Sequence, residues 1–261
     1  MSPRDNAVLP TLLNTLHLPS IGRNWMQITE TADREGWPAA KTLATLVEIE
    51  VADRASRRIQ RHRAESGLPA GKTFACFDFT AAPGIRKAHL LNLAQDVGWI
   101  DTGNNLLVFG QSGTGKSHAV AAIGSALIDA GRRVLFTSTT DIVQKLQVAR
   151  RELSLSAALD KLDKYHLVIL DDLSYVRKDQ AETSVLFELI AHRYERHSIA
   201  ITANQPFSEW DEIFPQPAMT VAAIDRLVHH ATIIEMNGPS YRKRAAAERA
   251  NTTVVETVAD N

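Results

Sequence analysis

The segment Gly110-Gln111-Ser112-Gly113-Thr114-Gly115-Lys116-Ser117 decides how this chain folds. It fits the phosphate-loop pattern G-x-x-x-x-G-K-[ST] without a mismatch. The apolar run 106–109 precedes it and predicts a short buried strand, and residues 118–130 carry apolar side chains at helical spacing. Because this strand, loop and helix are the context that the motif requires, a chance match in a glycine turn is the weaker interpretation, and the segment predicts a nucleoside triphosphate site.

The chemistry of the predicted site follows from its residue types. The glycines permit positive φ and a close approach of the backbone, so that successive N–H groups point at phosphate oxygens from the positive end of the next helix. Lys116 is expected to reach the β- and γ-phosphates, and Ser117 to hold Mg²⁺. The predicted nucleotide contacts are Gly110, Gln111, Ser112, Gly113, Thr114, Gly115, Lys116, Ser117 and His118.

Composition limits the class of protein. The 261 residues are 44% hydrophobic and 23% charged, which is ordinary for a globular chain with one large domain and a smaller companion. Lys plus Arg number 29 against 30 Asp plus Glu, so any basic surface must be local. The single cysteine, Cys76, excludes a disulfide framework and a Cys-rich zinc site, and we expect it to be buried. No apolar run predicts a signal peptide or a membrane span, so we expect a cytoplasmic protein without a membrane partner.

The first segment, residues 1–72, predicts a small all-helical domain. Pro10 is expected to begin a short helix, and Pro38 a long one that continues to about Glu65. Gly67-Leu68-Pro69 then ends the long helix.

The second half of this long helix is basic. Its Arg54, Arg58 and Arg61 are spaced i, i+4 and i+7 and share one face. One interpretation is a solvated face, partly paired by Glu50 and Asp53; the other is a helix that contacts nucleic-acid phosphates, for which the arginine fork is suited. The sequence leaves both open. The candidate nucleic-acid contacts are Arg54, Arg57, Arg58, Arg61 and Arg63.

Residues 73–251 predict a second domain of the α/β class, followed by a loose tail, 252–261. Strands alternate with helices, which indicates a parallel sheet in a three-layer fold. We expect Thr139 or Thr140 to cap the helix after the second strand. The five predicted strands are 106–109, 133–138, 167–172, 199–204 and 232–236.

Polar residues follow two of these strands. Asp171 and Asp172 end the third strand, where the first carboxylate would hold the water shell of Mg²⁺ and the second would polarise the attacking water. Asn204 ends the fourth strand and would orient that water or touch the γ-phosphate. A strand between the phosphate loop and the Asp-Asp pair, 133–138, is typical of ATPases that activate water with a carboxylate. The alternative is two acids that merely cap a strand.

The order of these motifs resembles the AAA+ ATPases. More closely, the chain is similar to the IstB family, the transposition helper ATPases of two-gene insertion sequences, which are related to DnaC-type helicase loaders. The resemblance covers nearly the whole chain, including the helical first segment. The matching runs are Phe77-Asp78-Phe79, Gly110 to Ser117, His192-Arg193-Tyr194-Glu195-Arg196, Ile201 to Trp210, Asp225-Arg226-Leu227-Val228-His229-His230 and Ser240-Tyr241-Arg242.

The resemblance implies an AAA+ ATPase, preceded by a helical domain, that binds ATP and Mg²⁺ and self-assembles on duplex DNA. Its partner would be the transposase encoded beside it. The implied catalytic residues are Lys116, Asp172, Asn204 and Arg226, and the implied metal ligands are Ser117 and Asp171. Arg226 would reach a neighbouring subunit's γ-phosphate, which would make hydrolysis slow and dependent on assembly. Arg242 is a second candidate for phosphate sensing.

Two departures from the AAA+ pattern qualify these expectations. Most AAA+ proteins have Glu where this chain has Asp172, which puts fast turnover in doubt. Little sequence follows Arg242, so we expect no helical lid.

Other functions stay open at this point. A replicative helicase loader of the DnaC type would use the same ATPase core. A small-molecule kinase would need an acceptor pocket, which nothing in the chain suggests, and the Asp172 departure leaves a non-hydrolysing nucleotide switch open. His229 and His230 are unassigned, and packing is the favoured interpretation for them.

Overall fold

The computed structural model describes residues 3–82, 84–173, 180–206, 209–210, 217–238 and 240–241. Contacts divide the chain into two compact units, Met1–Arg61 and His62–Asn261. The boundary lies earlier than the expected one at residue 72. The reason is that residues just after Arg61 pack on the second unit: the Ser66 carbonyl, for example, accepts a hydrogen bond of 2.7 Å from the Phe136 N–H.

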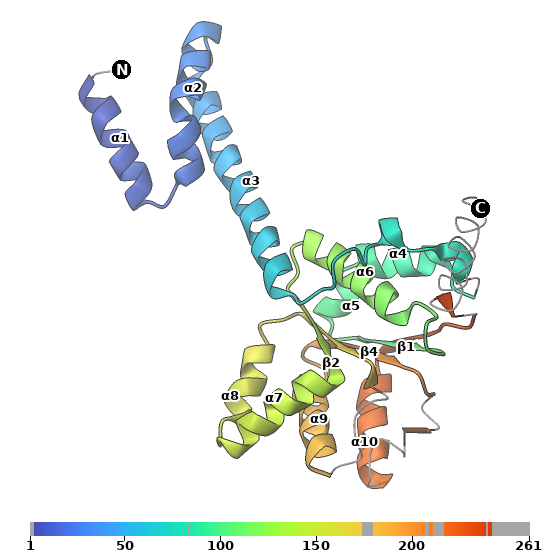
Figure 1. Cartoon of the computed structure of the whole chain (residues 1–261). Coiled ribbons are helices and arrows are strands. Elements are labelled where there is room, and N and C mark those ends of the chain that lie inside the picture. Colours follow the sequence, from blue (N-terminus) through green and yellow to red (C-terminus); the bar gives the residue numbers. More distant parts are fainter. Residues whose placement is uncertain are drawn as a thin grey trace, which may run out of the picture. The chain divides into compact units, whose positions relative to one another are not determined.

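The first unit is helical, as expected (Figure 1). It contains α1 (Pro3–Thr15), α2 (Pro19–Glu35) and most of α3 (Ala39–Glu65). Its small core is made by Leu13, Ile21 and Trp25, which are at most 8% exposed. The expectation that Pro10 begins a helix is wrong, because Pro10 lies inside α1.

Two carboxylates of α3 hold the start of α2. Leu18, the residue before α2, offers no side-chain cap. Instead the buried Glu50 carboxylate accepts hydrogen bonds from the N–H groups of Ser20 at 2.8 Å and Ile21 at 3.2 Å. Asp53 accepts a hydrogen bond from the Ser20 hydroxyl. A side chain of one helix therefore supplies the cap that the sequence next to α2 lacks.

The second unit alternates strands and helices. The segment 74–81 forms two short 3₁₀ turns, η1 (Phe74–Cys76) and η2 (Phe79–Ala81). The other elements are α4 (Lys87–Gln95), α5 (Gly98–Asp101), β1 (Asn105–Phe109), α6 (Lys116–Asp129), β2 (Val134–Ser138), α7 (Thr139–Arg151), α8 (Leu155–Leu162), β3 (Leu167–Asp171), α9 (Gln180–Arg193), β4 (Ser198–Ala203), α10 (Pro217–Val228) and β5 (Ala231–Glu235).

The five strands form one parallel sheet in the order β2-β3-β4-β1-β5. Figure 1 shows helices α4 and α6 on one face and α7, α8, α9 and α10 on the other, which confirms the three-layer prediction. The strand β2, which separates the two motifs in sequence, lies at the edge of the sheet. The strand between β1 and β3 in space is β4. The residues that end β1, β3 and β4 therefore meet at one edge.

Apolar side chains join the sheet to the helices of the layer formed by α7, α8, α9 and α10. Side chains of β3 and β4, such as Val168, Leu170 and Ile201, pack with those of α7, α9 and α10.

Ser138, not Thr139 or Thr140, caps α7, since its hydroxyl accepts a hydrogen bond of 3.0 Å from the Asp141 N–H. No helix among the described residues is both long and apolar enough to cross a membrane.

Candidate nucleotide site

The phosphate loop has the backbone that the sequence predicts. Gly110, Gly113 and Gly115 have φ values of 147°, 88° and 98°, where L residues are strained. At Gly110 space is also lacking, because an added Cβ would lie 2.2 Å from the Met236 carbonyl oxygen. The loop ends at the first residue of α6, so the N–H groups of the first turn are directed at whatever occupies the loop.

Lys116 is held in place by three oxygen atoms. Its ammonium donates to the carbonyls of Gly110 at 2.7 Å and Gln111 at 2.9 Å, and to the Asn204 Oδ1 at 2.7 Å. The residue is only 7% exposed. A buried ammonium is stable only with such partners, so this cation is fixed at the mouth of the loop.

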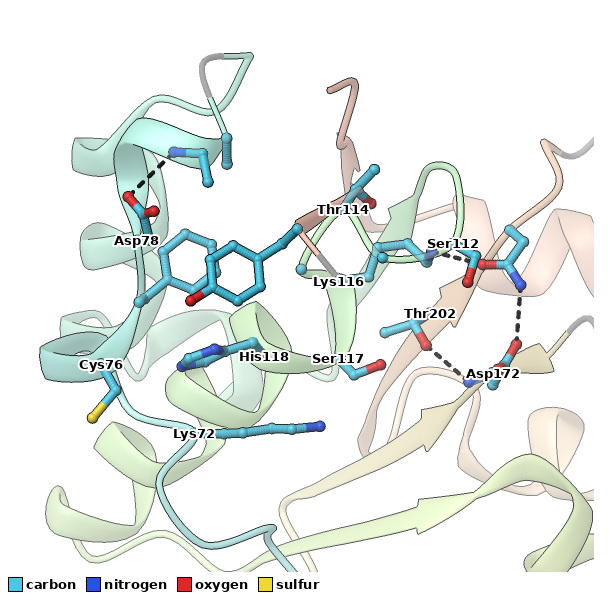
Figure 2. Close-up of a pocket in the computed structure, with 17 residues that line it drawn as sticks. Lys72, Cys76, Asp78, Ser112, Thr114, Lys116, Ser117, His118, Asp172 and Thr202 are labelled. Atoms are coloured by element: carbon cyan, nitrogen blue, oxygen red, sulfur yellow. Dashed lines mark hydrogen bonds between the residues drawn. The ribbon is translucent and has the colours of Figure 1, made fainter. Parts of the chain in front are cut away.

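The two acids of β3 are joined by a residue of β4. The Thr202 hydroxyl donates to the Asp171 Oδ1 at 2.6 Å and accepts from the Asp172 N–H at 2.8 Å. Asp172 has a left-handed backbone, φ 63°. Its Oδ1 accepts a 3.4 Å hydrogen bond from the Asn204 amide. Figure 2 shows Thr202 and Asp172 linked on the side of the cavity where Lys116 and Ser117 lie.

These residues surround a cavity of about 320 Å³. One side is formed by the phosphate loop, from Ser112 to His118, together with Asp172, Thr202 and Asn204; the other side comes from residues 72–82. The volume falls in the range of small-molecule sites. Most of the predicted nucleotide contacts line it; Gly110 and Gln111 do not, although their carbonyls hold Lys116.

The wall made by residues 72–82 was not predicted. Phe77 packs edge-on against the His118 ring at 5.1 Å between centroids, and the Thr73 carbonyl lies 3.0 Å from the His118 Nε2. These contacts join the wall to α6. Cys76 is exposed and lines the cavity, so the expectation of a buried cysteine is wrong.

The donor set fits a magnesium ion. Ser117 lines the cavity. Asp171 is the last residue of β3, and its carboxylate is oriented by the Thr202 hydroxyl. A hydroxyl and a carboxylate are hard oxygen ligands, the type that Mg²⁺ prefers. Asp171 does not itself line the cavity, which suits a carboxylate that acts through the water shell of an ion.

Arg226 lies away from this cavity. It belongs to α10, where its guanidinium lies over the Phe187 ring at 5.3 Å and donates to the Ala222 carbonyl at 2.9 Å. It lines a different hollow, with Tyr194 and Asp225. The structure thus brings Lys116, Asp172 and Asn204 together and leaves Arg226 apart. Arg242, Phe207 and Ser208 lie outside the described residues.

The candidate nucleic-acid arginines differ from one another. Arg54 pairs with Glu50 at 2.9 Å, and Arg57 pairs with Asp53 at 3.1 Å. Arg63 donates to Ser125 at 3.0 Å and to Asp129 at 2.5 Å, both on α6. Within the part of the chain that the structure describes, Arg58 and Arg61 make no ion pair, and both are exposed.

The two histidines are surface residues. The His229 Nδ1 lies 2.8 Å from the Tyr194 hydroxyl, and the His229 and His230 rings have centroids 4.1 Å apart. Both are exposed, so they are not packed in the core.

Besides the wall of residues 72–82, the sequence analysis did not identify Thr202 as a site residue. It precedes Asn204 by two positions in the predicted strand 199–204, a spacing that would place both side chains on the same face. That spacing was available in the sequence. The pairing of β3 with β4, which places Thr202 beside the acids, was not.

The fold and this site define an AAA+ P-loop protein that binds ATP. The family model described as IstB-like ATP binding protein matches residues 11–249. The chain belongs to this IstB-like family.

Similar sequences carry related names. A putative insertion sequence ATP-binding protein of Sinorhizobium fredii is 62% identical over 244 residues, which are 94% of this chain and 82% of that protein. The insertion sequence IS21 putative ATP-binding protein of Pseudomonas aeruginosa is 31% identical over 251 residues, covering 95% and 94% of the two chains.

Solved structures agree on the fold. The replication initiator DnaA bound to AMPPCP and single-stranded DNA matches with a TM-score of 0.55 and 18% identity, over 72% of this chain and 56% of that one. DnaI matches with a TM-score of 0.52 and 17% identity, over 66% and 96%. At this identity the likeness concerns the fold alone.

Proposed function

We propose that this protein is a DNA-binding ATPase that assembles on duplex DNA with ATP and assists the transposase of an insertion sequence. The observation that carries the proposal is the chain of contacts around the phosphate loop, from Lys116 through Asn204 to Asp172. A binding site alone needs no carboxylate near the γ-phosphate position. Here a carboxylate and an amide lie beside the lysine, the residue set that hydrolysis requires.

Each residue has a role that its position supports. Lys116 neutralises phosphate charge, and the loop N–H groups orient the phosphates. Asp172 accepts a proton from the attacking water, and Asn204 positions that water. Bound Mg²⁺, held by Ser117 and by Asp171 through its water shell, would neutralise further phosphate charge.

In this proposal Arg226 couples ATP hydrolysis to assembly. This arginine lines a hollow other than its own chain's phosphate-loop cavity, which supports a role at the nucleotide of a neighbouring copy. An arginine supplied in trans would make turnover depend on assembly.

The DNA and transposase parts of the proposal rest on the basic helix and on the relatives. Arg58 and Arg61 are exposed side chains on α3, suited to phosphate contacts. Relatives named for insertion sequences cover nearly the whole chain, which favours the transposition role over helicase loading. Arg63 is engaged with α6 and is left out of the proposed DNA contacts.

The test compares wild type, Lys116→Ala and Asp172→Asn with ATP and duplex DNA. Lys116→Ala should abolish ATP binding and ATP-dependent assembly. Asp172→Asn should bind ATP but turn it over about 10²–10⁴ times more slowly, as expected when a general base is removed, and should trap the DNA complex.

Three measurements decide the outcome: binding of a fluorescent ATP analogue, phosphate release, and electron microscopy of the protein with DNA and a non-hydrolysable analogue. Assembly by Lys116→Ala equal to that of wild type would contradict the central claim. Wild-type turnover by Asp172→Asn would mean that another residue activates the water.

A further inference from the structure

The contact that no motif accounts for is the bridge between the two acids of β3. Thr202 is 1% exposed, yet it lines the nucleotide cavity. One hydroxyl makes two short contacts, donating to Asp171 and accepting from the main chain of Asp172. Because a hydroxyl has only one hydrogen, its direction is fixed: the proton points at Asp171.

The first contact orients the Asp171 carboxylate. A carboxylate oxygen that accepts a 2.6 Å hydrogen bond is held in one rotamer. Asp171 is also held through its main chain, since the Thr139 hydroxyl donates to its carbonyl at 3.1 Å. An oriented Asp171 carboxylate is what the water shell of Mg²⁺ needs.

The second contact sets the backbone of Asp172. The chain turns left-handed at this residue, with φ 63°, directly after the strand ends. The Asp172 N–H therefore leaves the β3–β4 pairing, whose last registered pair is Leu170 with Ile201. The Thr202 hydroxyl takes the place of the lost strand partner for this N–H, so the same atom that orients Asp171 also fixes where the Asp172 side chain begins.

We propose that Thr202 is a positioning residue that links the metal-side acid, Asp171, to the water-activating acid, Asp172. The inference rests on the proposed ATPase function and adds a residue to it. Through this link, a shift of Asp171 on metal binding moves Asp172 as well. Outer residues of this type alter metal affinity or activity by about 10–100-fold when they are replaced.

The experiment compares wild type, Thr202→Val and Thr202→Ser. Valine keeps the shape and removes the hydroxyl, and serine keeps the hydroxyl. Affinity for a fluorescent ATP analogue is measured without and with Mg²⁺, and phosphate release is measured over a range of Mg²⁺ concentrations. A melting curve without nucleotide reports the fold.

Thr202→Val should bind the analogue without Mg²⁺ within about twofold of wild type, while the gain in affinity from Mg²⁺ and the turnover should each fall about 10–100-fold. Its half-saturating Mg²⁺ concentration should rise. Thr202→Ser should restore both quantities to within about threefold of wild type, since the two hydrogen bonds can form again. Should valine impair folding, Thr202→Ala provides the same comparison with a smaller side chain.

The outcomes separate this inference from the proposed function. A wild-type protein that does not hydrolyse ATP would overturn the proposed function itself. With an active wild type, an unchanged Mg²⁺ dependence in Thr202→Val would overturn the role of Thr202. Equal losses in the valine and serine variants would also overturn it, because packing and not the hydroxyl would then be responsible.

Discussion

Arg193 shows how one buried cation holds several segments. Its guanidinium donates to the carbonyls of Leu162 at 2.9 Å, Tyr165 at 2.8 Å and Ser198 at 3.1 Å, and the residue is 0% exposed. Burial lowers its pKa to about 10, partly offset by Asp163, so the side chain stays charged at neutral pH. The end of α8 and the start of β4 are thus joined through one side chain.

Replacing Arg193 with Met should lower the free energy of unfolding by about 3 kcal/mol or more, because several buried carbonyls lose their donors. Urea unfolding followed by circular dichroism measures this change. The matched control is Arg196→Met, since Arg196 also pairs with Asp163 but is 57% exposed. That variant should change stability by less than about 1 kcal/mol. Equal effects in both variants would show that the buried carbonyls do not depend on Arg193.

At the scale of elements, α2 depends on α3 for its first turn. Burial raises the pKa of Glu50, but hydrogen bonds from Arg54 and from the Ser20 and Ile21 N–H groups outweigh it, so the pKa lies below the ordinary value of 4.5. The pKa of Asp53 is lowered as well, first by the Ser20 hydroxyl. Both groups bind protons less readily in the folded chain than in the unfolded one.

The sign of the pH dependence follows. The contribution of Glu50 to stability is complete above pH 4.5 and is lost as the pH falls through the lowered pKa of the folded state. Glu50→Gln should lower the stability of the first unit by about 1–2 kcal/mol at pH 7, the cost of a lost helix cap, and should flatten its decline in acid. Hydrogen exchange of the α2 amides at pH 7, and urea unfolding at pH 7 and pH 4, measure the two effects.

The control for this prediction is Glu48→Gln, which removes the same charge from an exposed position on α3. It should leave α2 exchange unchanged. ATP affinity should be unchanged in both variants, because the cap lies in the first unit. Protection of α2 in Glu50→Gln equal to that of wild type would mean that the cap is dispensable.

How far the elements could be predicted depends on whether their cause is local. The phosphate loop and the five strands were predictable because the residues that determine each of them, the spaced glycines or the apolar run, are contiguous in the sequence. The cap of α2 by Glu50 was not, because its donors lie about thirty residues away in sequence and meet Glu50 only when α2 and α3 pack. The bridge made by Thr202 was also not predictable, because it forms only when β3 pairs with β4.

At the scale of the whole molecule, two units carry separate tasks in the proposal. The second unit contains every residue of the nucleotide cavity, and the first contains Arg58 and Arg61. The one helix that passes from the first unit into the second is α3, which places the basic residues just before the boundary.

Replacing Arg58 and Arg61 together with Gln should weaken duplex DNA binding and lower the slope of log affinity against log salt by about 2, one for each lost phosphate contact. Fluorescence anisotropy at several salt concentrations measures the slope. ATP affinity should not change. Arg34→Gln, an exposed arginine of the same unit, serves as the control and should keep the wild-type slope. An unaltered slope in the double variant would mean that Arg58 and Arg61 face solvent and do not contact DNA phosphates.

The left-handed backbone at Asp172 has a consequence for which residues this position can accept. Among non-glycine residues, Asp and Asn tolerate such a conformation best, because their short polar side chains bond locally. The backbone geometry and the charge required at position 172 therefore both suit Asp. Asn is the neutral replacement that preserves the turn. A longer acid lacks this short-range local bonding, which gives a structural reason for the short carboxylate that this sequence carries.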